Sequence, residues 1–232
     1  MFSIVIPLFN EDRNIVELID EINLSLKKNY VYEIILINDA STDQTFNNIS
    51  KLKNKNIKIL NNPTNKGQSY SIHRGVYNSL YKIIITLDGD GQNDPADIPK
   101  LIQYYLKHNN VTLVGGIRRK RKDKIIKIIS SKVANLIRSK IFNDGCKDTG
   151  CSLKVFDKNI FLSFPYFDGI HRFIPALFTG YGYQTKFLDV NHRKRKYGVS
   201  KYGTTNRLFR GIIDIIKVKK ILREKGSYDI HT

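Results

Sequence analysis

Two hydrophobic periodicities alternate along the first half of the chain. Runs rich in apolar residues, typical of strands covered on both faces, occupy residues 3–9, 32–38, 57–60, 82–87 and 111–115. Between these runs, apolar side chains recur at helical spacing, first at Ile15, Leu18, Ile19, Ile22 and Leu26. Asn10, which precedes Glu11 and Asp12, is the expected N-cap of that first helix.

This alternation of strands and helices, joined by short connections, predicts an α/β fold. We expect a Rossmann-like, mostly parallel sheet with helices on both faces. In such sheets, ligands bind beyond the carboxyl ends of the strands. Three polar segments fall at such ends, at residues 9–11, 38–41 and 88–92. The sequence therefore predicts that these segments converge on one edge of the sheet.

The second half of the chain is less regular. After a basic loop at 118–122, the pattern predicts an amphipathic helix at 125–142, strands at 152–156 and 185–191, and helices at 170–179 and 205–222. The last of these helices is basic and amphipathic, as are helices that lie on anionic membranes, although the same pattern fits a helix packed on the sheet.

No internal repeat or low-complexity linker divides the sequence. We expect one continuous domain over residues 1–204 with a C-terminal extension. A basic amphipathic helix and tail occupy residues 205–232.

The charge distribution separates the two parts of the chain. Of its 232 residues, 39 are basic and 21 acidic, a formal net charge of +18. Residues 1–99 carry 10 basic and 12 acidic side chains, and residues 100–232 carry 29 and 9. The basic excess indicates an anionic partner, whether nucleic acid, a phosphate compound or an acidic membrane surface.

Several classes of protein do not fit the sequence. No apolar run is long enough to cross a bilayer, and no N-terminal signal pattern is present. Two cysteines, Cys146 and Cys151, cannot build a disulfide framework. There is no Walker A loop, Gly-x-Gly-x-x-Gly loop or recognisable nucleophile–histidine arrangement. We therefore expect a cytoplasmic enzyme or binding protein.

Two acidic segments and one basic segment are candidates for chemistry. Asp88 and Asp90 follow a buried strand and present carboxylates suited to Mg²⁺ or Mn²⁺, although an ordinary acidic turn has the same composition. Residues 38–43 suit either a base and ribose or an Asx turn with a helix cap. The basic segment 192–202 suits either a diphosphate or a solvated surface. Asp94, before Pro95, is expected to cap a helix.

Six short segments together resemble one known family. They are IPLFNE (6–11), NDASTD (38–43), LDGDGQ (87–92), DTGC (148–151), HRF (171–173) and GVSKY (198–202). In this order they resemble the inverting family 2 glycosyltransferases of the GT-A fold, and within it the dolichol-phosphate mannosyltransferase-like branch of polyprenyl-phosphate glycosyltransferases. The resemblance covers residues 3–205. It implies a catalytic GT-A domain over residues 1–204, with a nucleotide- and metal-binding half at 1–116 and an acceptor- and phosphate-binding half at 117–204.

The resemblance implies a role for each matching residue. The residues implied to bind the nucleotide sugar are Pro7, Phe9, Glu11, Ile37, Asp39, Asp88, Gly89, Asp90, Gln92, Arg118, Arg195 and Lys201. Those implied to hold the metal are Asp88, Asp90 and Gln92, and those facing the acceptor phosphate are Lys154, Arg172 and Ser200. The implied catalytic residues are Asp88, Asp90 and Asp148.

The resemblance also implies the reaction. A hexose, with mannose as a candidate, passes with inversion from GDP-mannose or a UDP-hexose to a dolichyl- or undecaprenyl-type phosphate, with Mg²⁺ or Mn²⁺ as cofactor. The enzyme is expected to be peripheral on the cytoplasmic face of an anionic membrane surface. One alternative is a family 2 enzyme that extends a growing glycan or uses another non-lipid acceptor. A basic nucleic-acid-binding module leaves the acidic strand ends unexplained, so nucleic acid is not an expected partner.

Overall fold

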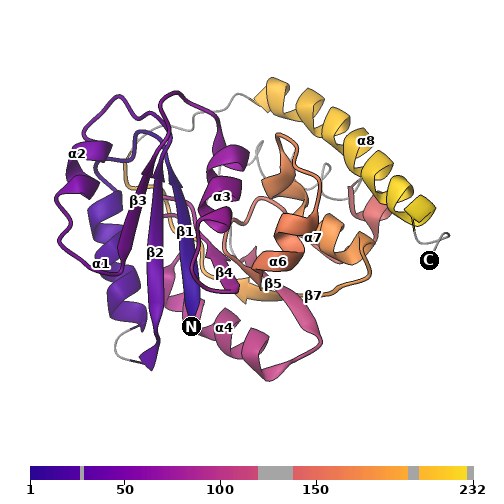
Figure 1. The fold of residues 1–232 in the computed structure, drawn as a ribbon, viewed down its shortest axis with the longest axis horizontal. Helices are drawn as coiled ribbons and strands as arrows, with labels where there is room; N and C mark the ends of the chain where they lie inside the picture. Colours follow the sequence, from indigo (N-terminus) through magenta and orange to yellow (C-terminus); the bar gives the residue numbers. More distant parts are fainter. Residues whose placement is uncertain (27–28, 120–137, 198–203, 229–232) are drawn as a thin grey trace.

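The computed structural model describes residues 1–26, 29–119, 138–197 and 204–228 (Figure 1). Its strands are β1 (Phe2–Leu8), β2 (Tyr32–Asn38), β3 (Ile57–Asn61), β4 (Ile83–Thr86), β5 (Val111–Arg118), β6 (Lys154–Asp157) and β7 (Gln184–Val190). Its helices are α1 (Ile15–Leu26), α2 (Thr45–Ser50), α3 (Gln68–Tyr77), the 3₁₀ turn η2 (Pro95–Asp97), α4 (Ile98–Lys107), α6 (Lys158–Ser163), α7 (Ile170–Gly180) and α8 (Thr204–Tyr228).

The strands form one sheet in the order β3-β2-β1-β4-β6-β5-β7. All neighbours are parallel except β6, which runs antiparallel to β4 and β5 on either side of it. The reversal of β6 matters for the site, because the amino end of β6 lies at the same edge as the carboxyl ends of β4 and β5. The predicted α/β class with a mostly parallel sheet is confirmed.

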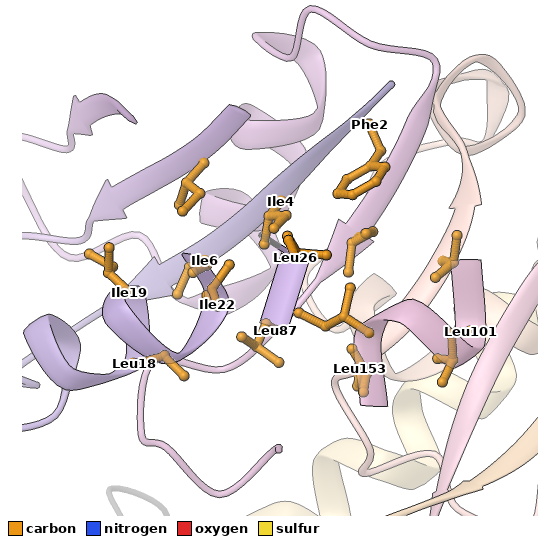
Figure 2. Close-up of a cluster of buried hydrophobic side chains, with 14 of the residues drawn as sticks. Phe2, Ile4, Ile6, Leu18, Ile19, Ile22, Leu26, Leu87, Leu101 and Leu153 are labelled. Carbon is orange, nitrogen blue, oxygen red and sulfur yellow. The ribbon is translucent and has the colours of Figure 1, made fainter. Parts of the chain in front are cut away.

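Helices cover both faces of this sheet, as predicted. Strand residues alternate between the faces: on β1, Ile4 and Ile6 join the cluster under α1 and α4, whereas Val5 joins the cluster under α3, α6 and α7. Figure 2 shows the first cluster, where Leu18 and Ile22 of α1 pack against the sheet. Because both faces are covered, the polar groups of the central strands reach solvent only at the strand ends.

The start of the first helix differs from the prediction. The helix begins at Ile15, and Asn10 is not its N-cap but lies in the preceding loop with a left-handed φ of 53°. Its side-chain oxygen accepts a hydrogen bond from the Thr42 amide at 2.8 Å, and its own amide donates to Ser41 Oγ at 3.0 Å. These contacts between the β1 and β2 loops outweigh the local capping preference, which sequence patterns cannot register.

The C-terminal helix α8 lies at the end of the molecule away from α1 and α2 (Figure 1). Val218 is fully buried, and Ile215 and Leu222 pack against the cluster that includes α7. Ile213 and Ile216 are exposed on the other side. In the described part of the chain, no helix is both long and apolar enough to cross a membrane. Most of the helix predicted at 125–142 lies outside the described residues.

Candidate functional site

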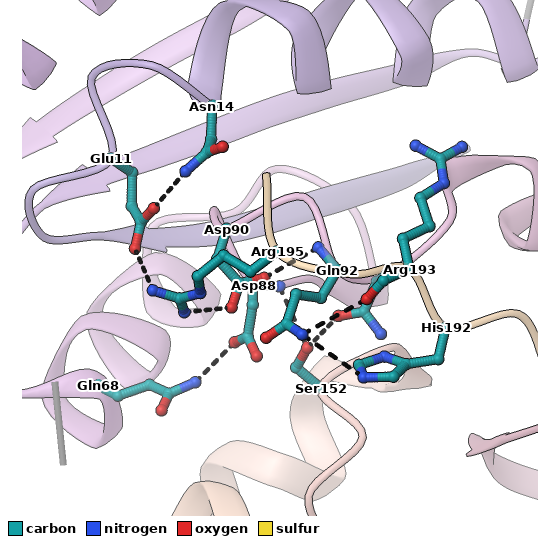
Figure 3. Close-up of polar contacts among 11 residues, drawn as sticks. Glu11, Asn14, Gln68, Asp88, Asp90, Gln92, Ser152, His192, Arg193 and Arg195 are labelled. Atoms are coloured by element: carbon teal, nitrogen blue, oxygen red, sulfur yellow. Dashed lines mark hydrogen bonds and ion pairs between the residues drawn. The ribbon is translucent and has the colours of Figure 1, made fainter. Parts of the chain in front are cut away.

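The aspartate pair predicted from the sequence lies at the carboxyl end of β4. Asp88 is oriented from two sides: Gln68, the first residue of α3, donates to its Oδ1 at 2.8 Å, and its own amide donates to Ser152 Oγ at 3.2 Å (Figure 3). Burial, together with the nearby charge of Asp90, raises the pKa of Asp88 to about 6. A buried pair of like charges attracts a cation.

A cation from the chain already lies against this pair. Arg195 donates to Asp90 Oδ2 at 2.5 Å, and its guanidinium lies 3.9 Å from Glu11 Oε1 (Figure 3). Glu11 is itself buried and accepts from Asn14 Nδ2 at 2.8 Å. Two acidic side chains, Glu11 after β1 and Asp90 after β4, thus lie against one positive charge. The oxygen donors of Asp88 and Asp90 fit a divalent cation, because Mg²⁺ binds one or two carboxylates together with substrate phosphates.

Arg195 is part of a basic segment, residues 192–197, that crosses the site. Arg193 bridges Glu21 and Asp94, at 2.6 Å to each. Lys196 pairs with Glu17 on α1, and Arg13 lies over the ring of Tyr197 at 5.9 Å from its centroid. The predicted diphosphate-binding segment therefore lies against the acidic side chains of the first half of the chain.

The turn between the two aspartates has a packing constraint. A Cβ on Gly89 would lie 2.4 Å from Leu8 Cδ2, so a side chain at this position collides with the core. The backbone N–H of Gln92 donates to Asp90 Oδ1 at 3.0 Å, which closes the turn. The Gln92 side chain points toward His192 and the Arg193 carbonyl, at 3.5 Å from each (Figure 3). Asp94 caps the following 3₁₀ turn by accepting from the Ala96 amide, as predicted.

The residues predicted to bind the nucleotide differ in their burial and in their contacts. Asp39 accepts from the Asn62 side chain at 2.7 Å and from the amides of Lys66 and Gly67 at 2.8 Å each, so its carboxylate orders the loop before α3. Ile37 is fully buried in the core, which leaves only its backbone to face a ligand. Pro7 and Phe9 are both half-buried at the end of β1. These roles stay predictions.

A second ionic pair lies where β5 ends. Arg118 is bidentate on Asp148, through Nε at 2.7 Å and Nη2 at 2.8 Å, and its backbone amide lies 3.2 Å from the same carboxylate. Both side chains are nearly buried, at 12% and 6% exposure. Gly150 lies beside the guanidinium, because a Cβ there would be 2.8 Å from Arg118 Nη2. The charge of Arg118 lowers the pKa of Asp88, which places this pair beside the aspartates.

The cations predicted to meet the acceptor phosphate belong to different networks. Lys154, the first residue of β6, is 3% exposed, donates to the Cys151 carbonyl and also lowers the pKa of Asp88. Arg172 instead pairs with Asp214 of α8 at 2.5 Å. Ser200 and Lys201 lie outside the described residues.

Sequence reasoning missed several polar residues at this edge. Gln68 and Ser152 hold Asp88, and Asn93 accepts from Ser152 Oγ at 2.6 Å. Ser69 links α3 to α7 through the His171 ring, at 2.7 Å from Nδ1. Gln68 follows a strand and a glycine, a position that the strand-end rule could have identified. No local pattern marks Ser152.

Among the described residues, neither a reactive cysteine thiolate nor a metal site built from three or more His, Cys, Asp and Glu side chains is supported at this edge. Cys146 and Cys151 are buried free thiols, and burial raises the pKa of Cys151 to about 11, so its thiol stays protonated at neutral pH. Among the described residues, no group of three or more His, Cys, Asp and Glu side chains could hold a metal ion. A cation here would use the two aspartates with oxygen ligands from elsewhere.

Comparisons with known proteins identify the family of the chain. Residues 3–163 match the family described as "Glycosyl transferase family 2". The chain is 34% identical to the dodecaprenyl-phosphate galacturonate synthase of Rhizobium johnstonii, over 97% of this chain and 68% of that protein. It is 30% identical to an undecaprenyl-phosphate 4-deoxy-4-formamido-L-arabinose transferase of Pectobacterium carotovorum, over 86% of this chain and 62% of that protein. The chain thus spans about two thirds of the length of these relatives.

The fold has solved counterparts. A glucosyl-3-phosphoglycerate synthase of Mycobacterium tuberculosis, crystallised with Mn²⁺, UDP-glucose and phosphoglyceric acid, superposes with a TM-score of 0.72. The match is 16% identical in sequence and covers 96% of this chain and 79% of that one. The GT-A fold that the motifs implied is confirmed, and so is the family.

Proposed function

The chain belongs to glycosyl transferase family 2, and from this membership we propose that it transfers a sugar from a nucleoside-diphosphate donor to a polyprenyl phosphate. The observation that carries the proposal is the buried pair Asp88 and Asp90 with Arg195 against it. Two carboxylates at a strand end and a cation from the basic segment suit a diphosphate, whose oxygens need both a divalent cation and direct positive charge.

The relatives narrow the acceptor class. Both carry the name of a polyprenyl phosphate acceptor, dodecaprenyl in one and undecaprenyl in the other, while their sugars differ. We therefore assign this chain a polyprenyl phosphate acceptor and a nucleotide sugar donor, of which UDP-hexoses and GDP-mannose are the candidates. The solved enzyme with UDP-glucose is an example of the fold rather than of this substrate pair.

The reaction needs no proton to be removed from the acceptor. An acceptor phosphate oxygen forms a bond to the anomeric carbon of the sugar, from the face opposite the leaving group. The bond from that carbon to the donor's β-phosphate oxygen breaks, and its electron pair leaves with the nucleoside diphosphate. The phosphate monoester becomes a diester, so the nucleophile is anionic from the start.

The residues of the site then have mainly electrostatic tasks. Asp88 and Asp90 would hold the divalent cation, Mg²⁺ or Mn²⁺, with Gln92 beside them. When bound, this cation neutralises the charge that develops on the departing diphosphate. Arg195 supplies a second positive charge from the basic segment, and Gln68 and Ser152 keep Asp88 in place. Preorganised charges of this kind supply a large part of an enzyme's rate enhancement.

The described face of α8 suits attachment to an anionic membrane, which is where a polyprenyl phosphate resides. Ile213 and Ile216 are exposed, and so are Lys217, Lys219 and Lys220. We infer that this face rests on the cytoplasmic side of the membrane as an interfacial helix, with apolar side chains among the headgroups and lysines on anionic lipids.

The test is transfer of radiolabelled sugar by the purified chain. Vesicles carrying undecaprenyl or dolichyl phosphate are incubated with Mn²⁺ and each of several UDP-hexoses or GDP-mannose, and lipid-soluble label is counted. We expect label in the lipid phase with one donor and no label with Asp90→Ala. Transfer to soluble glycans alone would point to the non-lipid alternative and overturn the acceptor assignment.

A further inference from the structure

We propose that Asp148 is a positioning residue that fixes Arg118, and that it does not act as a catalytic base. The inference rests on the proposed function, because it concerns how the same edge of the sheet treats the donor. It assigns a task to the one predicted catalytic carboxylate that is not part of the aspartate pair and that has an arginine partner of its own.

The hydrogen bonds of Asp148 commit its carboxylate to Arg118. One oxygen accepts from Arg118 Nε at 2.7 Å and the other from Nη2 at 2.8 Å, which is the two-point geometry in which guanidinium and carboxylate match best. The backbone amide of Arg118 adds a third contact at 3.2 Å. Both oxygens of the Asp148 carboxylate are thus directed at Arg118, which suits a role in holding this side chain.

The surroundings of the guanidinium are shaped for the same arrangement. Gly150 leaves room for Arg118 Nη2, since a Cβ at this position would be 2.8 Å from it and 3.7 Å from Asp148 Oδ1. Gly150 lacks a positive φ, so its missing side chain is needed for space and not for backbone freedom. Asp148 thus holds the guanidinium by hydrogen bonds, and Gly150 provides the space that it occupies.

The position of Arg118 explains why confinement matters. It ends β5, beside β6 and the loop that carries Ser152, and its charge acts on Asp88. A nearly buried cation so close to the aspartates lies where a donor diphosphate or sugar would be bound. Side-chain freedom would cost binding entropy there, and the ion pair removes that freedom in advance. The proposed reaction also supplies no acceptor proton for Asp148 to remove.

The two roles of Asp148 predict different behaviour in three purified variants: Asp148→Asn, Gly150→Ala and the double variant that combines both changes. Asparagine still accepts one guanidinium N–H but cannot act as a base. Alanine at 150 displaces Arg118, a flexible side-chain end, while leaving the carboxylate intact. Melting temperatures establish that each variant is folded.

A positioning role predicts that the single variants Asp148→Asn and Gly150→Ala lose transfer to a similar extent, about 10- to 100-fold, mainly through a weaker donor KM. The double variant loses no more than about the worse single one, because both changes act through Arg118. The pH dependence of kcat for Asp148→Asn runs parallel to that of the unaltered chain. A much larger loss in Asp148→Asn alone, with a flattened acid side of its pH profile, would overturn the proposal in favour of a base.

Failure of the proposed function would look different. If the unaltered chain transferred no sugar to polyprenyl phosphate, the acceptor assignment would fail, and binding of UDP or GDP with Mn²⁺ would still test the role of Asp148. Calorimetry should then show the same order, with Asp148→Asn and Gly150→Ala both weaker by about 10-fold. Equal nucleotide affinity in all variants would overturn the positioning role.

Discussion

The two parts of the chain contribute opposite charges to the same edge of the sheet. The first 99 residues supply acids, among them Glu11, Asp88 and Asp90, whereas the later residues supply cations such as Arg193 and Arg195. Acids of the first part pair with cations of the second across this edge. A net charge of +18 therefore describes the molecule poorly, because the excess of basic residues and the buried ion pairs have different tasks.

The second part treats its own acids differently. Asp148, Asp144 and Asp214 each pair with an arginine from the same part of the chain, namely Arg118, Arg138 and Arg172. These pairs are largely buried. Acids of the later part therefore fix its arginines in place, whereas acids of the first part hold a basic segment that a donor diphosphate could compete for.

The largest effect should come from removing the centre of the charge contact. Asp90→Ala should lower transfer by roughly 10³-fold or more, because several kcal/mol of charge stabilisation depend on the cation held there. Steady-state transfer and a melting curve measure this. Asp20→Asn, which removes an exposed acid on α1, is the matched control and should stay within a few-fold of the unaltered rate. A folded Asp90→Ala chain with full activity would remove the metal role.

Substitutions at Arg195 and Arg193 compare the arginine that contacts Asp90 with a neighbouring arginine that pairs elsewhere. Arg195→Ala should lower transfer by about 10²-fold, as loss of one charge-stabilising donor does elsewhere. Arg193 contacts Glu21 and Asp94 instead of the aspartate pair, so Arg193→Ala should cost only a few-fold. Without nucleotide, Arg195→Ala should bind Mn²⁺ more tightly, because the arginine no longer competes for Asp90. Calorimetry with Mn²⁺ alone tests this sign, and weaker Mn²⁺ binding would contradict it.

Asp88 should make both the stability of the chain and its transfer activity depend on pH. Its pKa is raised from 3.8 to about 6, so the folded chain holds this proton at a pH where the unfolded chain has lost it. Stability from this group is therefore present below about pH 4 and falls as the pH rises to about 6. The melting temperature of Asp88→Asn, relative to the unaltered chain in EDTA, should rise across that window. Mn²⁺ should cancel the difference, and a constant difference would contradict the assignment. Transfer should decline below about pH 6.

The smallest effect concerns packing under the site. Gly89→Ala should destabilise the fold by about 1–3 kcal/mol, because the new Cβ would collide with Leu8. Gly211→Ala in α8 is the control: a Cβ there meets nothing within 4 Å, and alanine favours a helix, so stability should hold or rise. Denaturant unfolding compares the two, and equal stabilities would show that the turn can relax.

The fold could be predicted because its information is local. Apolar runs and helical spacing marked the strands β1 to β5 and α1 to within a few residues, and the strand-end rule placed Asp88 and Asp90 at one edge with Glu11. The start of α1 was misplaced because Asn10 bonds to the loop after β2, a contact between distant segments. The predicted strand at 152–156 lies at Lys154–Asp157 and runs antiparallel, which its short apolar pattern does not encode.

The charged residues of the candidate site could be predicted from the sequence, but the residues that orient them could not. Residue types and spacing mark Asp88, Asp90 and the basic segment, whereas Gln68 and Ser152 are single polar residues without a pattern. The pairing of Arg172 with Asp214 was also invisible, since it depends on how α8 packs on α7. Such partners are set by tertiary packing, and only the structure reveals them.

The Arg118–Asp148 pair also has a consequence for how this scaffold can diversify. The pair joins residues 30 positions apart, at the point where the chain leaves β5 and approaches β6. A segment whose two ends are joined by an ion pair can be lengthened, shortened or exchanged without moving the strands, because closing a longer loop costs little extra free energy. Chimaeras that replace residues 120–137 would therefore keep both this pair and the buried pair of Arg138 with Asp144, and should leave the donor edge of the sheet intact.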